Sequence, residues 1–518
     1  MFVSGVAGNE GDSYLIKTRF FNGQEFVPVT LNEIEISGFL SPFQVETILH
    51  TSNPNIADVQ IDDKLFISKA EEINEILHLG AVNPHKRASV MAAILLSMLD
   101  STQPNIDAAP SVLISEINAR VQRILRNEGK PEFFDYIKLD LPATEDNHIK
   151  FKSAIVSTIQ ELNLLNIRSA MNSGADVLGK FYEVFLKYAN WAQDLGIVLT
   201  PRHVTQFAAE VTNIGPRDIV FDPCCGTGGF LVAAFDYIKR NSQGGQIDNF
   251  KRNSLFGIEQ DAGVASLAIV NMIFRGDGKN NIIEGNCFTK NLESMTRDGN
   301  PTAKYVTTSP IHPPITRVLM NPPFSLKRGS EKEYKFIDHA LKQMDDGGLL
   351  FSVLPYSCLV KPSAFKTWRR DLLRNNTLLS VISFPDIFYP VGVITVGIWI
   401  KKGIPPPHEQ NVLWIRALND GMLKSKGKRL PNPRVPNDLD RVRDILRAFL
   451  ATPTLTVENI EQFQKACPID FNDTFLELVP EAYLDQAPPT EEELQLAVEK
   501  MTRESVAFLI ESKFERQT

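Results

Sequence analysis

Residues 218–235, DIVFDPCCGTGGFLVAAF, decide the fold class of this 518-residue chain. A short apolar run ends at Asp222, a glycine-rich turn follows at 226–229, and helical apolar spacing begins near Phe230. Glycines let the backbone approach a ligand closely, and the start of a helix presents unpaired N–H groups. The stretch therefore predicts a strand, a turn and a helix that bind a ligand carrying a ribose or an anionic group.

The adjacent cysteines of this stretch, Cys224 and Cys225, leave three interpretations open. Pro-Cys is the dipeptide in which cytosine C5 methyltransferases carry their nucleophile, but the pair could also bind a metal or simply pack beside a ligand. The chain has five cysteines without CxxC spacing and no HExxH motif. This pattern predicts neither a structural metal site nor a disulfide framework, and it favours a reducing compartment.

The region around this stretch, residues 217–403, alternates short apolar runs with helical segments. Such alternation predicts βα units on a largely parallel sheet with helices on both faces, which is an α/β fold. The predicted strands are DIVF, SLFGIE, NIIEGN, TRVLMN, GLLFSVLP, LLSVISFP and VGIWIKK.

The flanking regions have different patterns of apolar and turn residues. Residues 1–65 mix short β-like runs with turns and form a small module of unknown role. Residues 66–195 repeat apolar positions at helical spacing, as in ASVMAAILLSMLD, SVLISEINARVQRIL and GKFYEVFLKYANWAQ, and predict a helical domain. We expect the α/β domain to cover residues 196–403. Residues 404–518 carry one more strand-like run, NVLWIRAL, and are expected to form a helical extension that contacts a partner.

The overall composition is that of a globular protein, with 43% hydrophobic and 22% charged residues. Its formal net charge is -8, so the chain lacks the positive electrostatic field of a protein that binds nucleic acid without a partner. Any binding to nucleic acid must therefore be local or shared with a partner. No apolar run is long enough to span a bilayer, and the N-terminus does not resemble a signal peptide. We expect a soluble, cytoplasmic chain without membrane contact.

Polar residues also follow the second and third predicted strands, and another polar residue precedes the first strand. Glu259 ends the second strand, where a carboxylate can accept hydrogen bonds from ribose hydroxyls, and Asn286 follows the third. Upstream, LTPR places Thr200 as the N-cap of a helix and Pro201 at its first position, so that the N–H groups of this helix can hold a carboxylate.

The fourth strand runs into Asn321, Pro322, Pro323 and Phe324. Two prolines restrict the backbone and remove N–H donors, which leaves the carbonyls and the Asn321 oxygen as acceptors for an NH₂ group. The aromatic ring provides a stacking face for a flat heterocycle.

Together these motifs resemble the amino-methyltransferases, which use S-adenosylmethionine to methylate exocyclic amines of DNA bases. The series GKFYEVFLKYA, LTPRHV, DPCCGTGGFL, GIEQD, NPPFS and FYPVGVITVGIWIKK is more closely similar to the methylation subunit of type I restriction-modification enzymes. The resemblance implies a Rossmann-like core with a mostly parallel seven-stranded sheet. It also implies that S-adenosylmethionine contacts Leu199, Thr200, Pro201, Arg202, Asp222, Gly226, Thr227, Gly228, Gly229, Glu259 and Asn286.

The implied reaction is N6-methylation of an adenine flipped out of double-stranded DNA, stacked on Phe324 and held by Asn321 and the Pro322 carbonyl. Sequence recognition would come from a separate specificity subunit, with a restriction subunit as a further partner. In cytosine C5 enzymes the nucleophile occupies the place where this chain has NPPF, so the two cysteines are interpreted as small side chains of the cofactor turn.

Three alternatives remain: a protein-glutamine or RNA-base methyltransferase, a solitary DNA methyltransferase, and a catalytically silent scaffold. A basic stretch is interpreted either as a phosphate contact or as a solvated helix face. It comprises Lys361, Lys366, Arg369, Arg370 and Arg374, together with Lys327 and Arg328 beside the catalytic loop.

Overall fold

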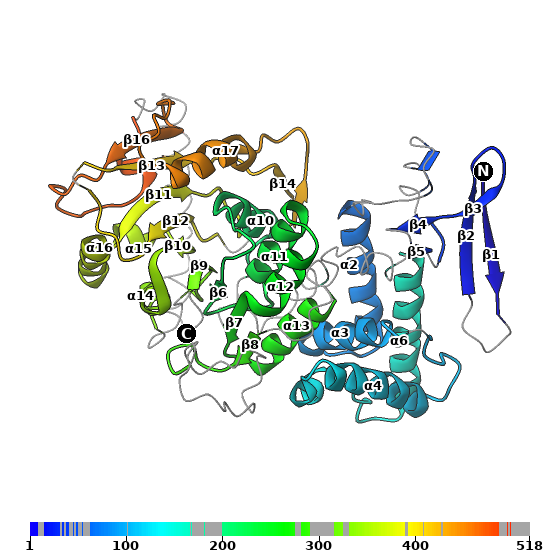
Figure 1. Cartoon of the computed structure of the whole chain (residues 1–518). Helices are drawn as coiled ribbons and strands as arrows, with labels where there is room; N and C mark the ends of the chain where they lie inside the picture. Colours follow the sequence, from blue (N-terminus) through cyan, green and yellow to red (C-terminus); the bar gives the residue numbers. More distant parts are fainter. Residues whose placement is uncertain are drawn as a thin grey trace.

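The fold is shown in Figure 1 as a computed structural model of the chain. The residues that it describes are 1–8, 15–31, 34–35, 38–40, 63–100, 102–165, 199–274, 281–290, 315–324, 331–388, 392–407, 409–425 and 428–485, with a few single positions outside these ranges.

A nine-stranded mixed sheet forms the centre of the molecule, in the order β16-β13-β11-β12-β10-β9-β6-β7-β8. The strands from β8 to β10 in this order are parallel, and β12 runs antiparallel to both of its neighbours. The bounds are β6 (Val220–Asp222), β7 (Leu255–Glu259), β8 (Asn281–Glu284), β9 (Ile315–Met320), β10 (Met344–Pro355), β11 (Thr377–Ser383), β12 (Thr395–Lys401), β13 (Asn411–Arg416) and β16 (Gln464–Pro468). The predicted α/β alternation is confirmed.

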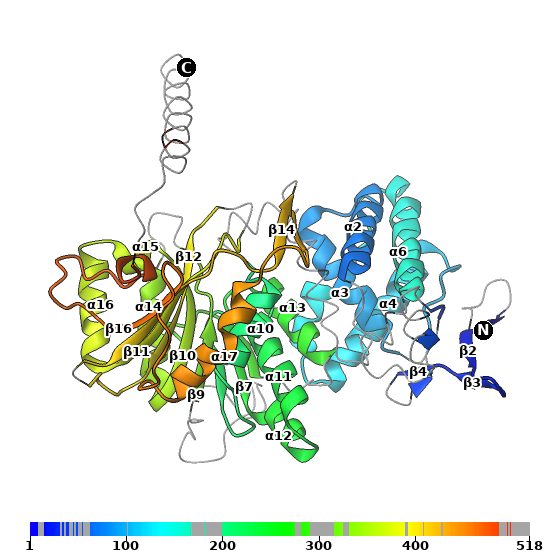
Figure 2. The ribbon, with the colours of Figure 1, turned by 90° about the horizontal axis from the view of Figure 1, so that it is seen from above.

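Helices cover both faces of this sheet, which explains why its strands are apolar on both sides. Figure 2 shows helices on both sides of the sheet. In β10, Phe351 and Val353 join the core on one face, while Leu350 and Leu354 join the core on the other. The first face carries α10 (Arg202–Val211), α11 (Gly229–Asn241), α13 (Ala262–Ile273) and α17 (Asp438–Ala451), and the second carries α14 (Glu333–Gln343), α15 (Ser357–Val360) and α16 (Ala364–Asn375). A further helix, α12 (Gly245–Asn253), precedes β7.

The direction of the strand order reverses at β6. From β6 the chain continues outward through β7 and β8, and then returns to place β9 on the other side of β6. The carboxyl ends of the strands on the two sides of such a reversal leave a crevice in which α/β proteins bind ligands. This topology brings the loops after β6, β7 and β9 to one edge of the sheet.

The helices before the sheet are α2 (Asp63–Leu79), α3 (Arg87–Ser97), α4 (Pro110–Asn127), α5 (Phe134–Ile137) and α6 (Asp146–Leu164). Helices α3 and α5 pack on α13, and the buried Lys130 ammonium donates to the Ile282 carbonyl of β8 at 3.4 Å. The third predicted helical segment, 179–193, lies outside the described residues apart from Phe181.

The N-terminal residues form short antiparallel strands. Strands β1 (Phe2–Ala7), β2 (Leu15–Phe21) and β3 (Phe26–Pro28) make one sheet, and β4 (Thr30–Leu31) pairs with β5 (Ile34–Glu35). Across the described part of the chain, every helix is too short or too polar to cross a lipid bilayer.

Two expectations about the sheet and its boundary need correction. The sheet has nine strands instead of seven, because β13 pairs with β11 and β16 pairs with β13. The run at 411–416 is buried along its centre, so it extends the sheet beyond the boundary expected at residue 403. Residues 404–485 are therefore a mixture of strands and one long helix. The rest of the predicted helical extension, 486–518, lies outside the described residues except for single positions.

Candidate active site

The glycine-rich turn has the backbone conformation that its sequence requires. Gly226 and Gly228 have φ values of 55° and 82°, in the left-handed region that favours glycine. A Cβ at Gly226 would meet nothing within 4 Å, whereas one at Gly228 would lie 3.6 Å from the Ala268 Cβ of α13. The turn is thus open on one side at Gly226 and packed against a helix at Gly228.

Glu259, at the end of β7, holds this turn from the neighbouring strand. Its Oε2 accepts a hydrogen bond from the Gly226 N–H at 2.9 Å, and its Oε1 accepts one from the Asp261 N–H at 2.9 Å. Burial raises the pKa of the Glu259 carboxyl, although both backbone bonds oppose that shift. Glu259 therefore has a structural role in the turn in addition to the ribose contact predicted for it.

Asp222, the last residue of β6, is buried directly beneath the turn. Its Oδ1 accepts from the Cys224 N–H at 3.1 Å. Burial raises its pKa to about 8, and the nearby Glu259 charge adds to that rise. Burial therefore favours the protonated form of the Asp222 carboxyl.

The two cysteines of the turn are packing residues. Cys225 is buried against β7, where a Cβ added at Gly257 would lie 2.9 Å from the Cys225 Sγ. Burial raises the pKa of both the Cys224 and the Cys225 thiol well above its ordinary value. A cysteine nucleophile acts as a thiolate, so neither thiol has the environment of a nucleophile.

Thr200 and Asn321, 121 positions apart in sequence, meet at the sheet edge. The Asn321 Nδ2 donates to the Thr200 Oγ1 at 2.9 Å. Helix α10 begins at Arg202 with Pro201 as its N-cap, so the prediction that Thr200 caps the helix is wrong by one residue. Pro201 has an extended ψ of 142°, and the Thr200 hydroxyl accepts from Asn321 instead of capping the helix.

The motif Asn321-Pro322-Pro323-Phe324 follows β9 directly, as predicted. The Phe324 ring is only 5% exposed and packs edge-on against Phe388, with ring centroids 5.6 Å apart. A base can stack on this ring only if the packing around it changes.

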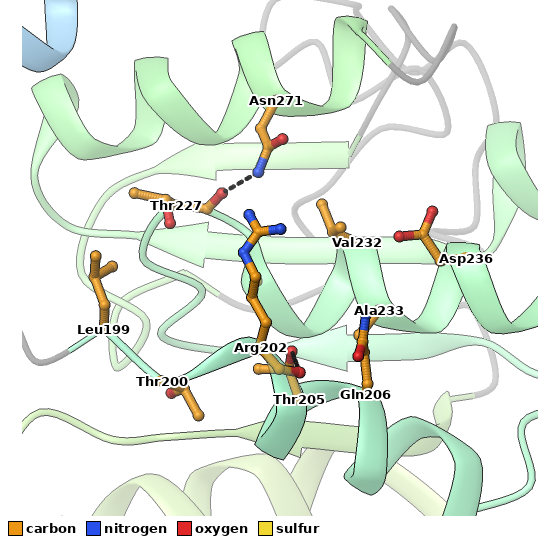
Figure 3. A pocket seen from close by; sticks show the side chains of 11 residues that line it. Leu199, Thr200, Arg202, Thr205, Gln206, Thr227, Val232, Ala233, Asp236 and Asn271 are labelled. Atoms are coloured by element: carbon orange, nitrogen blue, oxygen red, sulfur yellow. Dashed lines mark hydrogen bonds between the residues drawn. The ribbon is translucent and has the colours of Figure 1, made fainter. Parts of the chain in front are cut away.

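A small cavity of about 40 Å³ lies between α10 and the turn. Among the predicted residues it is lined by Leu199, Thr200, Arg202, Thr227 and Gly229, and the Arg202 side chain extends from α10 toward Thr227 (Figure 3). Ligand pockets for drug-sized molecules measure about 300–1,000 Å³, so this cavity alone does not hold a nucleoside-sized molecule.

Asn271 supports the turn from behind and was not predicted. It is buried on α13, and its Nδ2 donates to the Thr227 carbonyl at 3.2 Å. The signal in the sequence was a single amide in the mostly apolar segment AGVASLAIVNMI. A buried polar side chain on such a helix normally has a defined hydrogen-bond partner.

Asn286 has a more peripheral position than predicted. It is exposed after β8, and its Oδ1 accepts from the Phe288 N–H of its own turn at 2.9 Å. Its side chain is thus used, at least in part, to shape the loop in which it lies.

The basic stretch on α16 contains a residue with an internal role. Arg369 is 0% exposed and donates to the carbonyls of Cys358, Lys361, Phe475 and Leu476 at 2.8–3.0 Å. The interpretation of Arg369 as a phosphate contact is wrong, because its guanidinium satisfies buried backbone groups. Lys327 and Arg328 lie outside the described residues.

Comparison with known proteins agrees with this arrangement. The family model "N-6 DNA Methylase" matches residues 173–470. The chain is 32% identical over 387 residues to the type II restriction enzyme and methyltransferase RM.BcgI of Heyndrickxia coagulans, covering 69% of this chain and 57% of that protein. It is 26% identical over 400 residues to the type I restriction enzyme StySPI methylase subunit of Salmonella potsdam, covering 70% and 73%.

A solved structure shares the fold. The methyltransferase subunit of a type I restriction-modification system from Streptococcus thermophilus superposes with a TM-score of 0.51 at 18% identity, covering 80% of this chain and 98% of that one. The chain spans just over half the length of the Heyndrickxia coagulans relative. Since the family model matches more than half of the chain, and the turn and the NPPF motif meet at one sheet edge, the protein belongs to the N-6 DNA methylase family.

Proposed function

We propose that this chain is the modification subunit of a type I restriction-modification system, which transfers a methyl group from S-adenosylmethionine to N6 of an adenine in double-stranded DNA. The observation that carries the proposal is the hydrogen bond between Thr200 and Asn321, since it joins the cofactor motif to the acceptor motif. The relative from Salmonella potsdam is named as a type I methylase subunit, which supports the same assignment.

The residues at the sheet edge fit S-adenosylmethionine. Gly226 leaves open space where a side chain would stand, and the N-terminus of α11 follows the turn. The oxygens of Glu259 can each accept a ribose hydroxyl beside the backbone bond they already make, because a carboxylate oxygen has more than one lone pair. When bound, S-adenosylmethionine supplies an activated methyl group on a sulfonium.

Asn321 and Pro322 are proposed to accept hydrogen bonds from the target amine. Because the Asn321 Nδ2 donates to Thr200, the amide is oriented and its Oδ1 is the acceptor for the amine. Pro322 adds a backbone carbonyl in a restricted conformation. These acceptors stabilise the positive charge that develops on the nitrogen during transfer, and positioning supplies much of the remaining rate. No covalent enzyme intermediate is needed.

The proposed organisation assigns a role to each part of the chain. The catalytic unit comprises the S-adenosylmethionine-dependent core with β8, β7, β6, β9, β10, β12 and β11, and residues 66–195 form a helical domain before it. The strands and helix after residue 403 and the terminal segment contact a specificity subunit, which supplies sequence recognition, and a restriction subunit joins the same assembly. The negative net charge supports a shared DNA contact.

A second arrangement is favoured by one observation. The 32% identity with RM.BcgI, named as both a restriction enzyme and a methyltransferase, supports a modification module that works with a nuclease in another system type. Protein glutamine and RNA bases are the alternative substrates, since both carry a planar NH₂ group that could donate to the acceptors of an Asn-Pro-Pro-aromatic loop.

One assay separates these functions. Tritiated methyl transfer to DNA, RNA and protein is measured with the full chain, alone and with the products of the neighbouring reading frames. We expect methyl transfer to DNA that depends on a partner. Asn321→Ala should lose this transfer, while calorimetry should show that it still binds the cofactor. Full activity of Asn321→Ala, or transfer only to RNA or protein, would refute the proposal.

A further inference from the structure

A small antiparallel hairpin outside the central sheet carries an unfavourable pair of charges. It consists of β14 (Met422–Ser425) and β15 (Lys428–Pro431), and its register places Lys424 directly opposite Arg429. Like charges opposite each other on one face of a strand pair repel. The hairpin therefore needs carboxylates from elsewhere to hold this conformation.

Asp420 provides one of these carboxylates and links the hairpin to α10. It is 3% exposed, its Oδ2 forms an ion pair with the Arg429 guanidinium, and the same oxygen lies 2.9 Å from the His203 Nε2. His203 is the second residue of α10, next to Arg202 of the cofactor motif. One buried carboxylate thus connects the hairpin with the start of the cofactor helix.

The other side of the hairpin holds the loop after β11. Arg429 also donates through Nη1 to the Ile387 carbonyl, and Lys424 forms an ion pair with Asp386 at 3.5 Å. Phe388, which follows Ile387, packs on Phe324 of the acceptor motif. The hairpin therefore ties residues 384–388, which support the aromatic ring of the motif, to Asp420.

The backbone around Asp420 is itself held in place. The Asp438 carboxylate at the start of α17 accepts from the N–H groups of Leu418 and Asn419, each at 2.9 Å. Gly421 has a φ of 74°, in the left-handed region that favours glycine, and its N–H donates to the Pro436 carbonyl at 2.9 Å. These contacts fix the position from which Asp420 reaches both partners.

We infer that Asp420 is a positioning residue that fixes the distance between α10, which carries the cofactor motif, and the loop at 384–388, which packs on the acceptor motif. The contacts from His203 through Asp420 and Arg429 to the Ile387 carbonyl form the Asp420 brace. The inference rests on the proposed function for its catalytic consequence, but the mechanical link can be tested without methyl transfer. Asp420 and Arg429 lie outside both sequence motifs, and the Asp420 brace adds them to the machinery that aligns those motifs.

Hydrogen exchange of the full chain, read by mass spectrometry, tests the link itself. Asp420→Ala should raise the exchange rate of amides in residues 384–388 by about tenfold, because a tether of that loop is lost, while amides in α16 remain as in the unchanged protein. Asp346→Asn is the matched control, since it removes a carboxylate paired with Lys402 at 2.7 Å that is not part of the Asp420 brace. Unchanged exchange in 384–388, or a uniform rise across the chain, would overturn the inference.

Kinetics with S-adenosylmethionine and DNA give the second readout. Asp420→Ala should lower kcat by about tenfold or more, with the cofactor Kd changed much less, because misplacing the target base slows the chemical step. His203→Gln keeps an N–H that can reach Asp420 and should retain most of the rate, whereas His203→Ala should not. If Asp420→Ala does not fold, Asp420→Asn, which keeps the shape, should show the same changes in weaker form.

The outcomes separate this inference from the proposed function. Normal exchange and a normal kcat in a folded Asp420→Ala would overturn the brace even if the unchanged protein methylates DNA. Local loosening of 384–388 in a protein that transfers no methyl group to DNA would support the brace and refute the proposed function.

Discussion

Replacing Glu259 by glutamine tests whether this side chain holds the cofactor turn. In the structure its two oxygens accept from the N–H groups of Gly226 and Asp261, each at 2.9 Å. Glutamine has one oxygen and one NH₂ group, so it can accept from only one of these donors through the same geometry. Its NH₂ group would face the other backbone N–H, and one buried donor would lose its partner.

The size of the effect follows from that lost bond. Leaving one buried donor unsatisfied costs about 1–3 kcal/mol. If the turn of Glu259→Gln relaxes when no ligand is present, the cost appears when S-adenosylmethionine binds. The Kd for S-adenosylmethionine should then rise by roughly 5- to 150-fold, since about 1.4 kcal/mol corresponds to a factor of ten. If the turn keeps its shape, the cost appears in folding as a lower Tm.

Both quantities are measured on the same preparations, by calorimetric titration with S-adenosylmethionine and by scanning calorimetry. Glu284→Gln is the matched control, because Glu284 is the register partner of Glu259 on β8 but is exposed. We expect Glu284→Gln to behave as the unchanged protein. A Glu259→Gln protein with both Kd and Tm unchanged would show that the two backbone bonds do not hold the turn.

Three further predictions concern the same edge of the sheet. Thr200→Val removes the acceptor for the Asn321 Nδ2, so kcat in a methyl-transfer assay should fall about tenfold with Tm nearly unchanged; an unchanged kcat would contradict the orienting role. Gly257→Ala places a Cβ 2.9 Å from the Cys225 Sγ and should cost about 1–3 kcal/mol of stability, seen as a lower Tm, and adding Cys225→Ala should restore part of it. Asp222→Asn tests how the stability depends on pH. The folded pKa of Asp222 is raised to about 8, so folding takes up a proton at any pH between the unfolded pKa and 8. The free energy of unfolding therefore falls as the pH rises through that window. Tm should therefore decline more from pH 5 to pH 9 in the unchanged protein than in Asp222→Asn, and parallel profiles would refute the assignment.

Local sequence chemistry was sufficient for the turn and for the motif after β9. Positive φ values at Gly226 and Gly228 are requirements of one short segment, so glycine spacing alone could predict them. The same holds for the apolar runs that form strands β6 to β13, because strands covered by helices on both faces must be apolar on both sides.

Other features depend on which distant segments meet, and local patterns do not contain that information. Arg369 was part of a basic run typical of a phosphate contact, yet it is buried because a loop more than a hundred residues later supplies its carbonyl partners. Likewise, nothing near Asp420 in sequence indicates His203, which lies 217 positions away. Hydrogen-bond partners of buried charges are chosen by packing, and packing is a property of the whole chain.

By itself, the sequence determined the strand-turn-helix unit, the acceptor motif and their order along an α/β chain, because each depends on the conformational limits of neighbouring residues. Only the tertiary structure decided the partners of those groups. It placed Thr200 on Asn321, put Glu259 under the turn, and extended the sheet through β13 and β16. The physical reason is that strand order and the burial of polar groups are set by contacts between segments that only folding brings together.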